Sequence, residues 1–140
     1  MGYRARHFGL QELVCPEIYK ARGERAWELL DDESVAMLDG FRDYFGKITV
    51  NDYEWGGTFK YSGLRPLTGG VGAPYSMHRY GRAFDCKPKE VTVLEMYNAI
   101  LAKPEKFPLV RALENIKATP TWLHADRRNH MKAGIWVVNP

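Results

Sequence analysis

The sequence has few of the features that mark secreted, membrane-spanning or disulfide-stabilised proteins. Its two cysteines, Cys15 and Cys86, allow at most one disulfide and exclude a Cys-x-x-Cys zinc site. No stretch is apolar for long enough to span a bilayer, and the first twenty residues have no uninterrupted apolar core of a signal peptide. We therefore expect synthesis in the cytoplasm without a signal peptide, two buried thiols and no stable membrane association.

Runs of like charge and low-complexity segments are absent as well. The 20 Lys and Arg residues against 17 Asp and Glu residues give a net charge of only +3, so we expect no nucleic-acid partner. With 140 residues and 45% hydrophobic residues, the chain has the length and composition of one ordinary globular domain. Such a domain forms its core without disulfides or a structural metal, and any metal is therefore expected to serve function.

The hydrophobic pattern predicts an α+β fold. Two short helices are expected over residues 8–30, with breaks at Pro16 and Gly23, and a longer helix is expected over 34–46. A capping box at Thr92 opens another helix, which ends before Pro104. Strands are expected over 47–52, 58–62, 82–87, 109–116, 121–127 and 135–138, and a long loop over 62–75. The resulting expectation is a single compact domain with a mostly antiparallel sheet flanked by helices.

The most informative stretch is residues 76–85, which read Ser-Met-His-Arg-Tyr-Gly-Arg-Ala-Phe-Asp. A glycine three residues after His78 permits a tight turn into a strand, whose alternation aims Asp85 back across the same face. His124, on a neighbouring strand, supplies a third ligand. Two nitrogens and one oxygen leave the fourth tetrahedral position open, as catalytic zinc requires, and we predict one Zn²⁺ per chain.

These residues, with Trp-Leu-His-Ala-Asp at 122–126, resemble the zinc D-Ala-D-Ala carboxypeptidase and peptidoglycan endopeptidase family of metallopeptidases. The resemblance covers a motif core of about residues 45–128 and implies the fold of the Hedgehog and DD-peptidase group. It implies that His78, Asp85 and His124 are the zinc ligands and that Ser76 supports the loop of the first histidine. Ser76 is also expected to bind substrate. The segment Ser-Gly-Leu-Arg at 62–65 is similar to a family motif whose arginine faces the substrate, which implies that Arg65 binds substrate and stabilises the oxyanion.

One position departs from the family pattern. Many members carry an acidic general base three residues before the last histidine, and this chain has Thr121 there. Asp126, on the same strand face as His124, is the first replacement candidate, and Glu114 on the preceding strand is the second. Asp126 could instead orient a metal ligand, or pair with one of the two arginines that follow it.

The remaining candidates are aromatic residues and isolated histidines. Tyr80 and Trp122 are expected to line a substrate pocket, although aromatic residues at strand spacing also serve in cores. Cys86 is expected on the face opposite Asp85 and therefore buried. His7 and His130 are expected at the surface without a functional role.

Together, the resemblance implies a zinc-dependent peptidoglycan peptidase that hydrolyses a stem-peptide or cross-link amide. The chain's size, with no signal peptide and no separate wall-binding domain, favours a monomeric phage endolysin that acts at the bacterial cell wall. Because Thr121 replaces the usual base, a metal-binding, non-hydrolytic phage structural or regulatory module is an alternative. A hydrolase of the same fold that acts on a non-wall amide is another.

Overall fold

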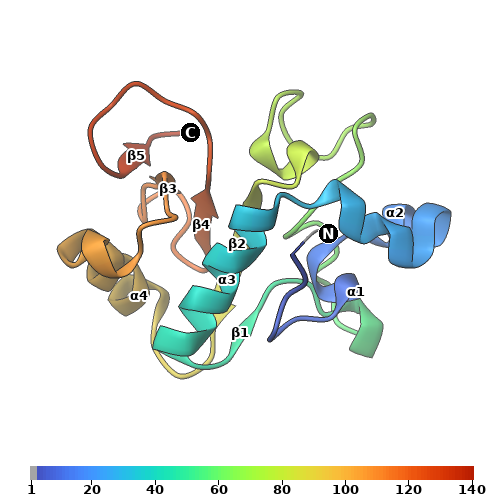
Figure 1. The fold of residues 1–140 in the computed structure, drawn as a ribbon, viewed down its shortest axis with the longest axis horizontal. Helices are drawn as coiled ribbons and strands as arrows, with labels where there is room; N and C mark the ends of the chain where they lie inside the picture. The colour runs from blue at the N-terminus through green and yellow to red at the C-terminus, as the bar shows by residue number, and fades with distance from the viewer. Residues whose placement is uncertain (1–2) are drawn as a thin grey trace.

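A five-stranded sheet forms the centre of the molecule, in the order β1-β2-β4-β3-β5 (Figure 1). The structure is a computed structural model and describes residues 3–140. The first three pairings are antiparallel and β3 pairs with β5 in parallel, which confirms the prediction of a mostly antiparallel sheet. The strands are β1 (Ile48–Thr49), β2 (Ala83–Pro88), β3 (Ala112–Glu114), β4 (Leu123–Asp126) and β5 (Trp136–Val138).

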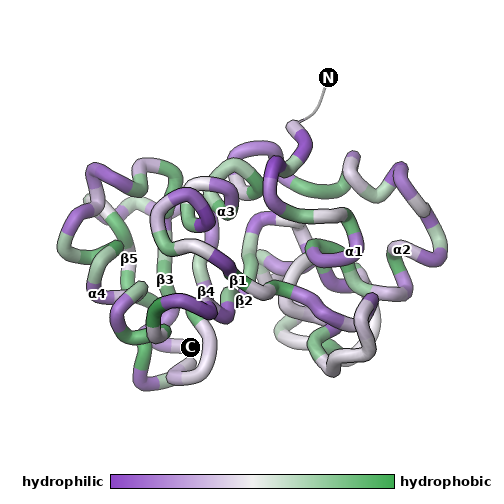
Figure 2. The backbone as a smooth tube through the Cα atoms, turned by 90° about the horizontal axis from the view of Figure 1, so that it is seen from below, coloured by the Kyte–Doolittle hydropathy of each residue, from purple (hydrophilic) through white to green (hydrophobic). Residues whose placement is uncertain are grey.

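Helices flank this sheet, with α1 and α2 to one side and α4 to the other (Figures 1 and 2). The α-helices are α1 (Leu10–Leu13), α2 (Pro16–Arg22), α3 (Asp32–Phe45) and α4 (Val93–Ala102). Short 3-10 helices are η1 (Gly23–Leu29), η2 (Tyr53–Trp55), η3 (Met77–Tyr80) and η4 (Pro104–Lys106). The fold is therefore α+β, as the sequence predicts. No helix within residues 3–140 has the length and apolarity needed to traverse a bilayer.

The sequence explains where the two long helices begin and end. The Asp31 carboxylate caps α3 by accepting from the Ser34 backbone at 3.0 Å. The helix stops at Gly46, whose φ of 81° only glycine adopts readily. Thr92 and Glu95 form the predicted capping box at the start of α4, each side chain bonding the backbone of the other. These helix predictions are confirmed.

Strand alternation divides the sheet into an apolar face and a polar face. One face contributes Phe84 and Cys86 of β2 to the hydrophobic core, where they join buried side chains of α3 and α4. The other face carries Asp85 of β2 together with His124 and Asp126 of β4. Both cysteines are free and buried, as predicted. The buried polar groups thus gather on one side of the sheet.

The predicted strand over residues 58–62 is wrong. Asp52 holds this segment instead, because its carboxylate accepts from the Phe59 backbone N–H at 2.9 Å and its own N–H donates to the Phe59 carbonyl at 3.1 Å. The side chain of Asn51 likewise accepts from the Ser62 N–H at 2.9 Å. Polar side chains therefore take the backbone groups that a strand ladder would use. The other predicted strands exist: β2 has its predicted length, shifted by one residue, and the rest are shorter.

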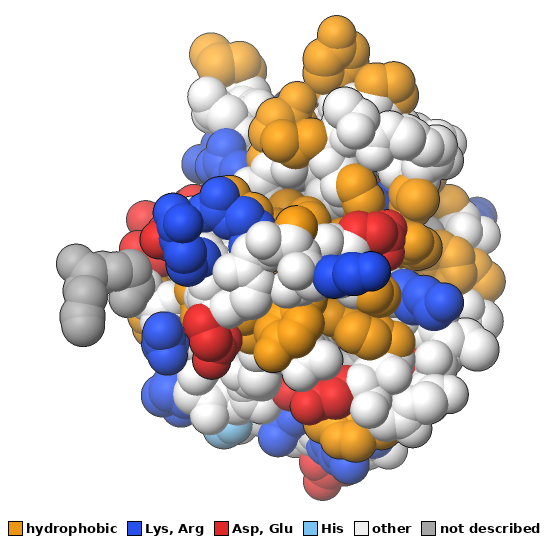
Figure 3. Space-filling view, turned by 90° about the vertical axis from the view of Figure 1, so that its right-hand side faces the viewer, with side chains coloured by type: hydrophobic (Ala, Val, Ile, Leu, Met, Phe, Trp, Pro, Cys, Tyr) orange, Lys and Arg blue, Asp and Glu red, His pale blue; other side chains and the backbone are white. Residues whose placement is uncertain are grey.

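The predicted loop over residues 62–75 contains no helix or extended strand. The guanidinium of Arg79 holds it in place by donating to the carbonyls of Leu67, Gly69 and Val71 at 2.6, 2.9 and 3.2 Å. Leu67 remains 68% exposed and Tyr75 82% exposed. Figure 3, in which the right-hand side of Figure 1 faces the viewer, shows hydrophobic side chains projecting at the top of the molecule.

Candidate metal centre

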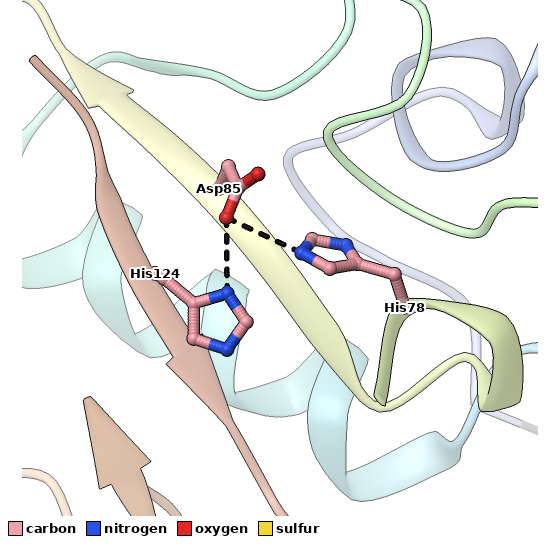
Figure 4. Close-up of side chains that lie close together, drawn as sticks. All are labelled: His78, Asp85 and His124. Atoms are coloured by element: carbon pink, nitrogen blue, oxygen red, sulfur yellow. Dashed lines mark hydrogen bonds and ion pairs between the residues drawn. The ribbon is translucent and has the colours of Figure 1, made fainter. Parts of the chain in front are cut away.

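Three side chains that the motifs predict as ligands come together on the polar face of the sheet (Figure 4). Asp85 on β2 lies directly opposite His124 on β4, and His78 reaches them from η3. Asp85 Oδ1 lies 3.3 Å from His78 Nε2 and 3.1 Å from His124 Nδ1. Zinc bonds of ~2.0–2.2 Å at tetrahedral angles separate ligand atoms by roughly 3.3–3.6 Å. These two separations suit a shared metal ion, and all three ligand atoms lie within 4.8 Å of one another, so the cluster could bind a metal ion.

A glycine and a serine position the first histidine. Gly81 ends η3 with a φ of 69°, and a Cβ there would lie 2.3 Å from the Leu29 carbonyl oxygen. Only glycine allows this close turn from η3 into β2. Ser76 caps the start of η3, where its hydroxyl accepts from the His78 backbone at 3.3 Å. Ser76 thus supports the His78 loop, and it also lines a cavity together with Glu114 and His124.

In each imidazole, one ring nitrogen forms a hydrogen bond outside the cluster, and the other ring nitrogen faces Asp85. His78 Nδ1 lies 3.0 Å from the Gly63 carbonyl oxygen, so Nδ1 carries the proton and Nε2 is left as an acceptor. His124 Nε2 lies 2.8 Å from Asp126 Oδ2, which leaves Nδ1 facing Asp85. Such hydrogen bonds behind a ligand fix its tautomer and raise its basicity.

Asp126 therefore lies behind His124, on the side away from the other two ligand groups. It is fully buried, and Arg128 donates to both of its oxygens at 2.5–3.0 Å. Burial opposes ionisation, but the bonds from His124 and Arg128 outweigh it and lower the Asp126 pKa to about 2. Of the two following arginines, Arg128 is the partner, since Arg127 pairs with Glu33. This geometry corresponds to the orienting role considered for Asp126.

Glu114 lies on the ligand side of the cluster instead. Its Oε1 is 3.4 Å from His124 Nδ1, the nitrogen that faces Asp85. Glu114 and His124 also line a cavity of about 330 Å³. Thr121, by contrast, lies in an exposed turn before β4. An acidic group is thus present at the cluster although the usual sequence position lacks one.

The guanidinium of Arg65 also reaches the cluster. Its Nη2 lies 3.4 Å from Asp85 Oδ2, and its Nε donates to the Tyr61 carbonyl at 2.7 Å. Gly72 makes room for it, because a Cβ on this glycine would lie 2.4 Å from Arg65 Nη1. Arg65 is therefore held beside the ligands by the long loop, with N–H groups left to donate.

The two aromatic candidates lie in different places. Trp122 lines a cavity of about 280 Å³ together with Asp85 and Arg65. Tyr80 is 48% exposed and lines a separate, mostly apolar cavity of about 420 Å³ beside Ile18 and Leu67. The structure thus brings Trp122 to the edge of the cluster but does not bring Tyr80 there.

The cluster is electrostatically coupled. Burial lowers the pKa of His78. For His124, burial acts in the same direction, but the hydrogen bonds that its ring donates to Asp126 and Asp85 outweigh it and raise the pKa to about 9. Burial disfavours the Asp85 carboxylate, yet the hydrogen bond that it accepts from His124 holds its pKa well below the usual range. Without a metal, the cluster therefore keeps Asp85 ionised and His124 protonated at neutral pH.

Sequence reasoning missed two contributors to this site, Gly63 and Lys87, and left Arg128 as one of two alternative partners of Asp126. Gly63 supplies the carbonyl behind His78, and a Cβ there would lie 2.2 Å from the Leu13 carbonyl oxygen. Arg128 fixes Asp126, and Lys87 lies buried on β2 two residues beyond Asp85. Strand alternation was a signal for Lys87, whereas a carbonyl contact such as that of Gly63 has no signature in the sequence. Neither His7 nor His130 belongs to the cluster.

Comparison with known proteins gives no relative: no protein-family model, curated protein or solved structure matches this chain.

Proposed function

We propose that this protein is a zinc-dependent peptidase that hydrolyses an amide bond of peptidoglycan. The observation that carries the proposal is the arrangement around His124 Nδ1, where a His, Asp and His ligand set has a further carboxylate, Glu114, on its ligand side. Two cavities border this arrangement, one at Asp85 and one at His124. A ligand set, an acid–base group and room for a substrate are the parts that a metallopeptidase needs.

The donor set fits zinc. Two imidazole nitrogens and one carboxylate oxygen form a three-residue set typical of catalytic zinc, and the hydrogen bonds behind both imidazoles agree with such a role. When bound, zinc supplies a Lewis acid that polarises a carbonyl group and makes water more acidic. His78, Asp85 and His124 would hold it.

The remaining side chains have distinct proposed roles. Glu114 accepts the proton of the attacking water and returns it to the leaving amine, because its carboxylate is half-buried beside the ligand nitrogen. Arg65 donates its free N–H groups to the oxyanion that develops on the scissile carbonyl. Asp126 holds His124 in the orientation that the metal requires. We thus assign the base to Glu114 rather than to Asp126.

The family resemblance supplies the substrate class, and two cavities on the polar face suit an extended peptide. We propose a peptidoglycan stem peptide or cross-link as the substrate and a phage endolysin acting at the bacterial cell wall as the biological role. The motifs at 76–85 and 122–126 carry this part of the proposal.

The test is mass spectrometry of fragments released from purified peptidoglycan by the zinc-loaded protein. We expect defined peptide fragments from the unaltered chain and none after His78→Ala, which removes a ligand. Glu114→Gln should keep one zinc per chain and lower the release rate by about 10²–10⁴-fold, as expected for the loss of a general base. The zinc content and release rate of Asp126→Asn are measured in parallel. Whichever of the two variants keeps its zinc but loses fragment release identifies the base.

Two results would contradict the proposal. Intact zinc binding without fragment release from any wall preparation would select a non-hydrolytic metal-binding module. Zinc-dependent turnover restricted to other amides would select a hydrolase that does not act on the wall.

A further inference from the structure

A further cavity lies where the parallel strands β3 and β5 begin, away from the metal cluster. It measures about 270 Å³, and none of its described lining residues lines either cavity at the cluster. Pro104 and Phe107, which follow α4, form one part of its lining, and Gly134 and Ile135, just before β5, form another. A ligand in this cavity would therefore lie outside the proposed active site.

The charged residues of this lining are both cations. Arg111 and Lys132 line the cavity, and the described lining includes no Asp or Glu. Glu105, which lies in the chain between two lining residues, is exposed and does not line it. Within residues 3–140, neither Arg111 nor Lys132 has an ion-pair partner. The positive charge of this cavity is thus uncompensated.

His130 joins the two cationic residues. Its Nε2 donates to the Arg111 carbonyl at 2.8 Å, and its Nδ1 accepts from the Lys132 backbone N–H at 3.1 Å. The His130 carbonyl in turn accepts from Arg111 Nη2 at 3.3 Å. These bonds fix a neutral imidazole with its proton on Nε2, and they hold the start of the loop before β5 against Arg111. The sequence alone gives His130 no role, whereas its contacts make it the link between Arg111 and Lys132.

Both cations keep most of their donors for a ligand. Of the five N–H groups of the Arg111 guanidinium, the one on Nη2 that bonds the His130 carbonyl is engaged. Lys132 Nζ lies 5.0 Å from the centre of the Trp136 ring, and this cation–π contact restrains the ammonium group without using a hydrogen-bond acceptor. Charged donors of this kind form stronger hydrogen bonds to anionic oxygens than neutral donors do.

The number of donors and charges favours phosphate over carboxylate. A phosphate monoester carries close to two negative charges and three acceptor oxygens, so it can match both cations and accept from both side chains. A carboxylate has one charge and two oxygens. Pro104, Phe107 and Ile135 add apolar surface to the lining, which suits the organic group of an ester.

We propose that this cavity binds a phosphate group. Arg111 and Lys132 donate to its oxygens, and His130 is a positioning residue that holds the two cations at the cavity. The phosphate group comes either from the free ion or from a phosphate monoester. This site goes beyond the proposed peptidase function and does not depend on it, because no residue of the metal cluster takes part.

The test is an NMR titration of the zinc-loaded protein at about pH 7.5, where a phosphate group carries close to two charges. The backbone amide signals of Lys132 and Gly134 and the Nε–H signal of Arg111 report on the cavity. The probes are inorganic phosphate, glycerol 3-phosphate and acetate, each at the same ionic strength. We expect saturable shifts of these signals with at least one phosphate probe, and binding of acetate that is about 10-fold weaker or less.

The two phosphate probes distinguish the sources. Tighter binding of glycerol 3-phosphate would identify a monoester as the ligand, because only the ester can use the apolar part of the lining. Equal or tighter binding of inorganic phosphate would identify the free ion.

Variants locate the binding within the cavity. Lys132→Ala, at an exposed position where folding is not at risk, should weaken phosphate binding about two- to fivefold. Arg111→Gln should weaken it about 10-fold. Lys117→Ala removes an equal charge from an exposed turn outside the cavity and should leave the affinity unchanged.

The positioning role of His130 has its own test. His130→Ala should weaken phosphate binding, because Lys132 and Arg111 lose the residue that joins them. His130→Gln should restore part of the affinity, since its side-chain amide can donate to the same Arg111 carbonyl. Equal affinities of His130→Ala and the unaltered chain would remove His130 from the site.

The phosphate site is overturned if acetate shifts the three signals as strongly as both phosphate probes do. It is also overturned if Lys132→Ala and Lys117→Ala weaken binding equally, because the overall charge of the protein would then account for it. Neither outcome bears on fragment release from peptidoglycan. Release without phosphate binding would retain the peptidase and reject this cavity, whereas phosphate binding without release would do the reverse.

Discussion

At the scale of single residues, Asp126 combines full burial with three partners: the His124 ring, the Arg128 guanidinium and the Arg128 backbone N–H. Such a carboxylate contributes by holding a ligand in place. We expect Asp126→Asn to weaken zinc binding by about 10- to 100-fold, because the amide cannot balance Arg128 or support the His124 imidazole as an anion does. Competition with a fluorescent zinc chelator measures this change.

The control for this variant is Asp43→Asn, which removes the same charge from an exposed ion pair with Arg6 and should leave zinc affinity unchanged. If Asp126→Asn kept full zinc affinity but lost turnover, Asp126 rather than Glu114 would be the base.

The raised pKa of His124, about 9, leads to a prediction for metal uptake. At pH 7 the metal-free His124 carries two ring protons, one of which occupies Nδ1. Nε2 keeps its proton for Asp126, so a metal at Nδ1 must displace the other. His78, with a lowered pKa, releases none. We expect His124 to contribute about one released proton per zinc at pH 7 and a contribution that falls toward zero above pH 9, separate from any proton lost by a zinc-bound water.

Calorimetric titration in buffers of different ionisation enthalpy gives the number of protons. Release of no proton at pH 7 would show that His124 is already neutral. The acidic groups around His124 would then raise its pKa less than their distances indicate.

At the scale of elements, the turn from η3 into β2 is the most constrained connection in the site. Gly81→Ala should destabilise the protein by about 2–4 kcal/mol, because the residue has a φ of 69° and its Cβ would meet the Leu29 carbonyl. Denaturant unfolding at equilibrium measures the change, with zinc affinity measured on the folded fraction.

Gly40→Ala is the matched control for that variant. Gly40 lies inside α3 with open space where a Cβ would point, so alanine should stabilise the helix by about 0.5–1 kcal/mol. Equal effects of both substitutions would contradict the close contact at Gly81.

Several elements were predictable because their signals are local. The capping box at Thr92 and the glycine at 46 fix helix ends within a few residues of sequence, and both helices were predicted. The strand over 58–62 failed because Asp52 and Asn51, outside the alternating segment, bind its backbone. Propensity within a segment contains no information on such competition.

The site residues likewise divide into those with a local sequence signal and those without one. A single strand alternation and one turn place Asp85 and His78, so the ligands could be predicted from their spacing. The position of the proposed base, Glu114, could not be predicted, because Glu114 approaches His124 only through the pairing of β3 with β4. Likewise, the choice of Arg128 over Arg127 as the partner of Asp126 depends on side-chain directions at the end of β4.

At the scale of the whole molecule, the hydrophobic core is separate from the metal cluster. The core lies between the apolar face of the sheet and the helices, whereas the ligands occupy the opposite face. We therefore expect the chelator-treated protein to keep its helical circular dichroism and to unfold cooperatively. Zinc at about 1,000 times its dissociation constant should add about 4 kcal/mol to the free energy of unfolding.

Thermal unfolding followed by circular dichroism, with and without chelator, checks this expectation. Loss of the helical signal on chelation alone would mean that the metal is needed for folding, as in small zinc-dependent domains.

The direct opposition of Asp85 and His124 on β2 and β4 makes the cluster sensitive to how these strands align. A slip of one residue in either strand would turn a ligand toward the hydrophobic face and abolish the cluster. Metal capture thus reports correct strand alignment, a step that joins segments almost forty residues apart in the chain. During refolding, the moment at which the chain first takes up a metal ion would therefore mark the moment at which β2 and β4 have found their register.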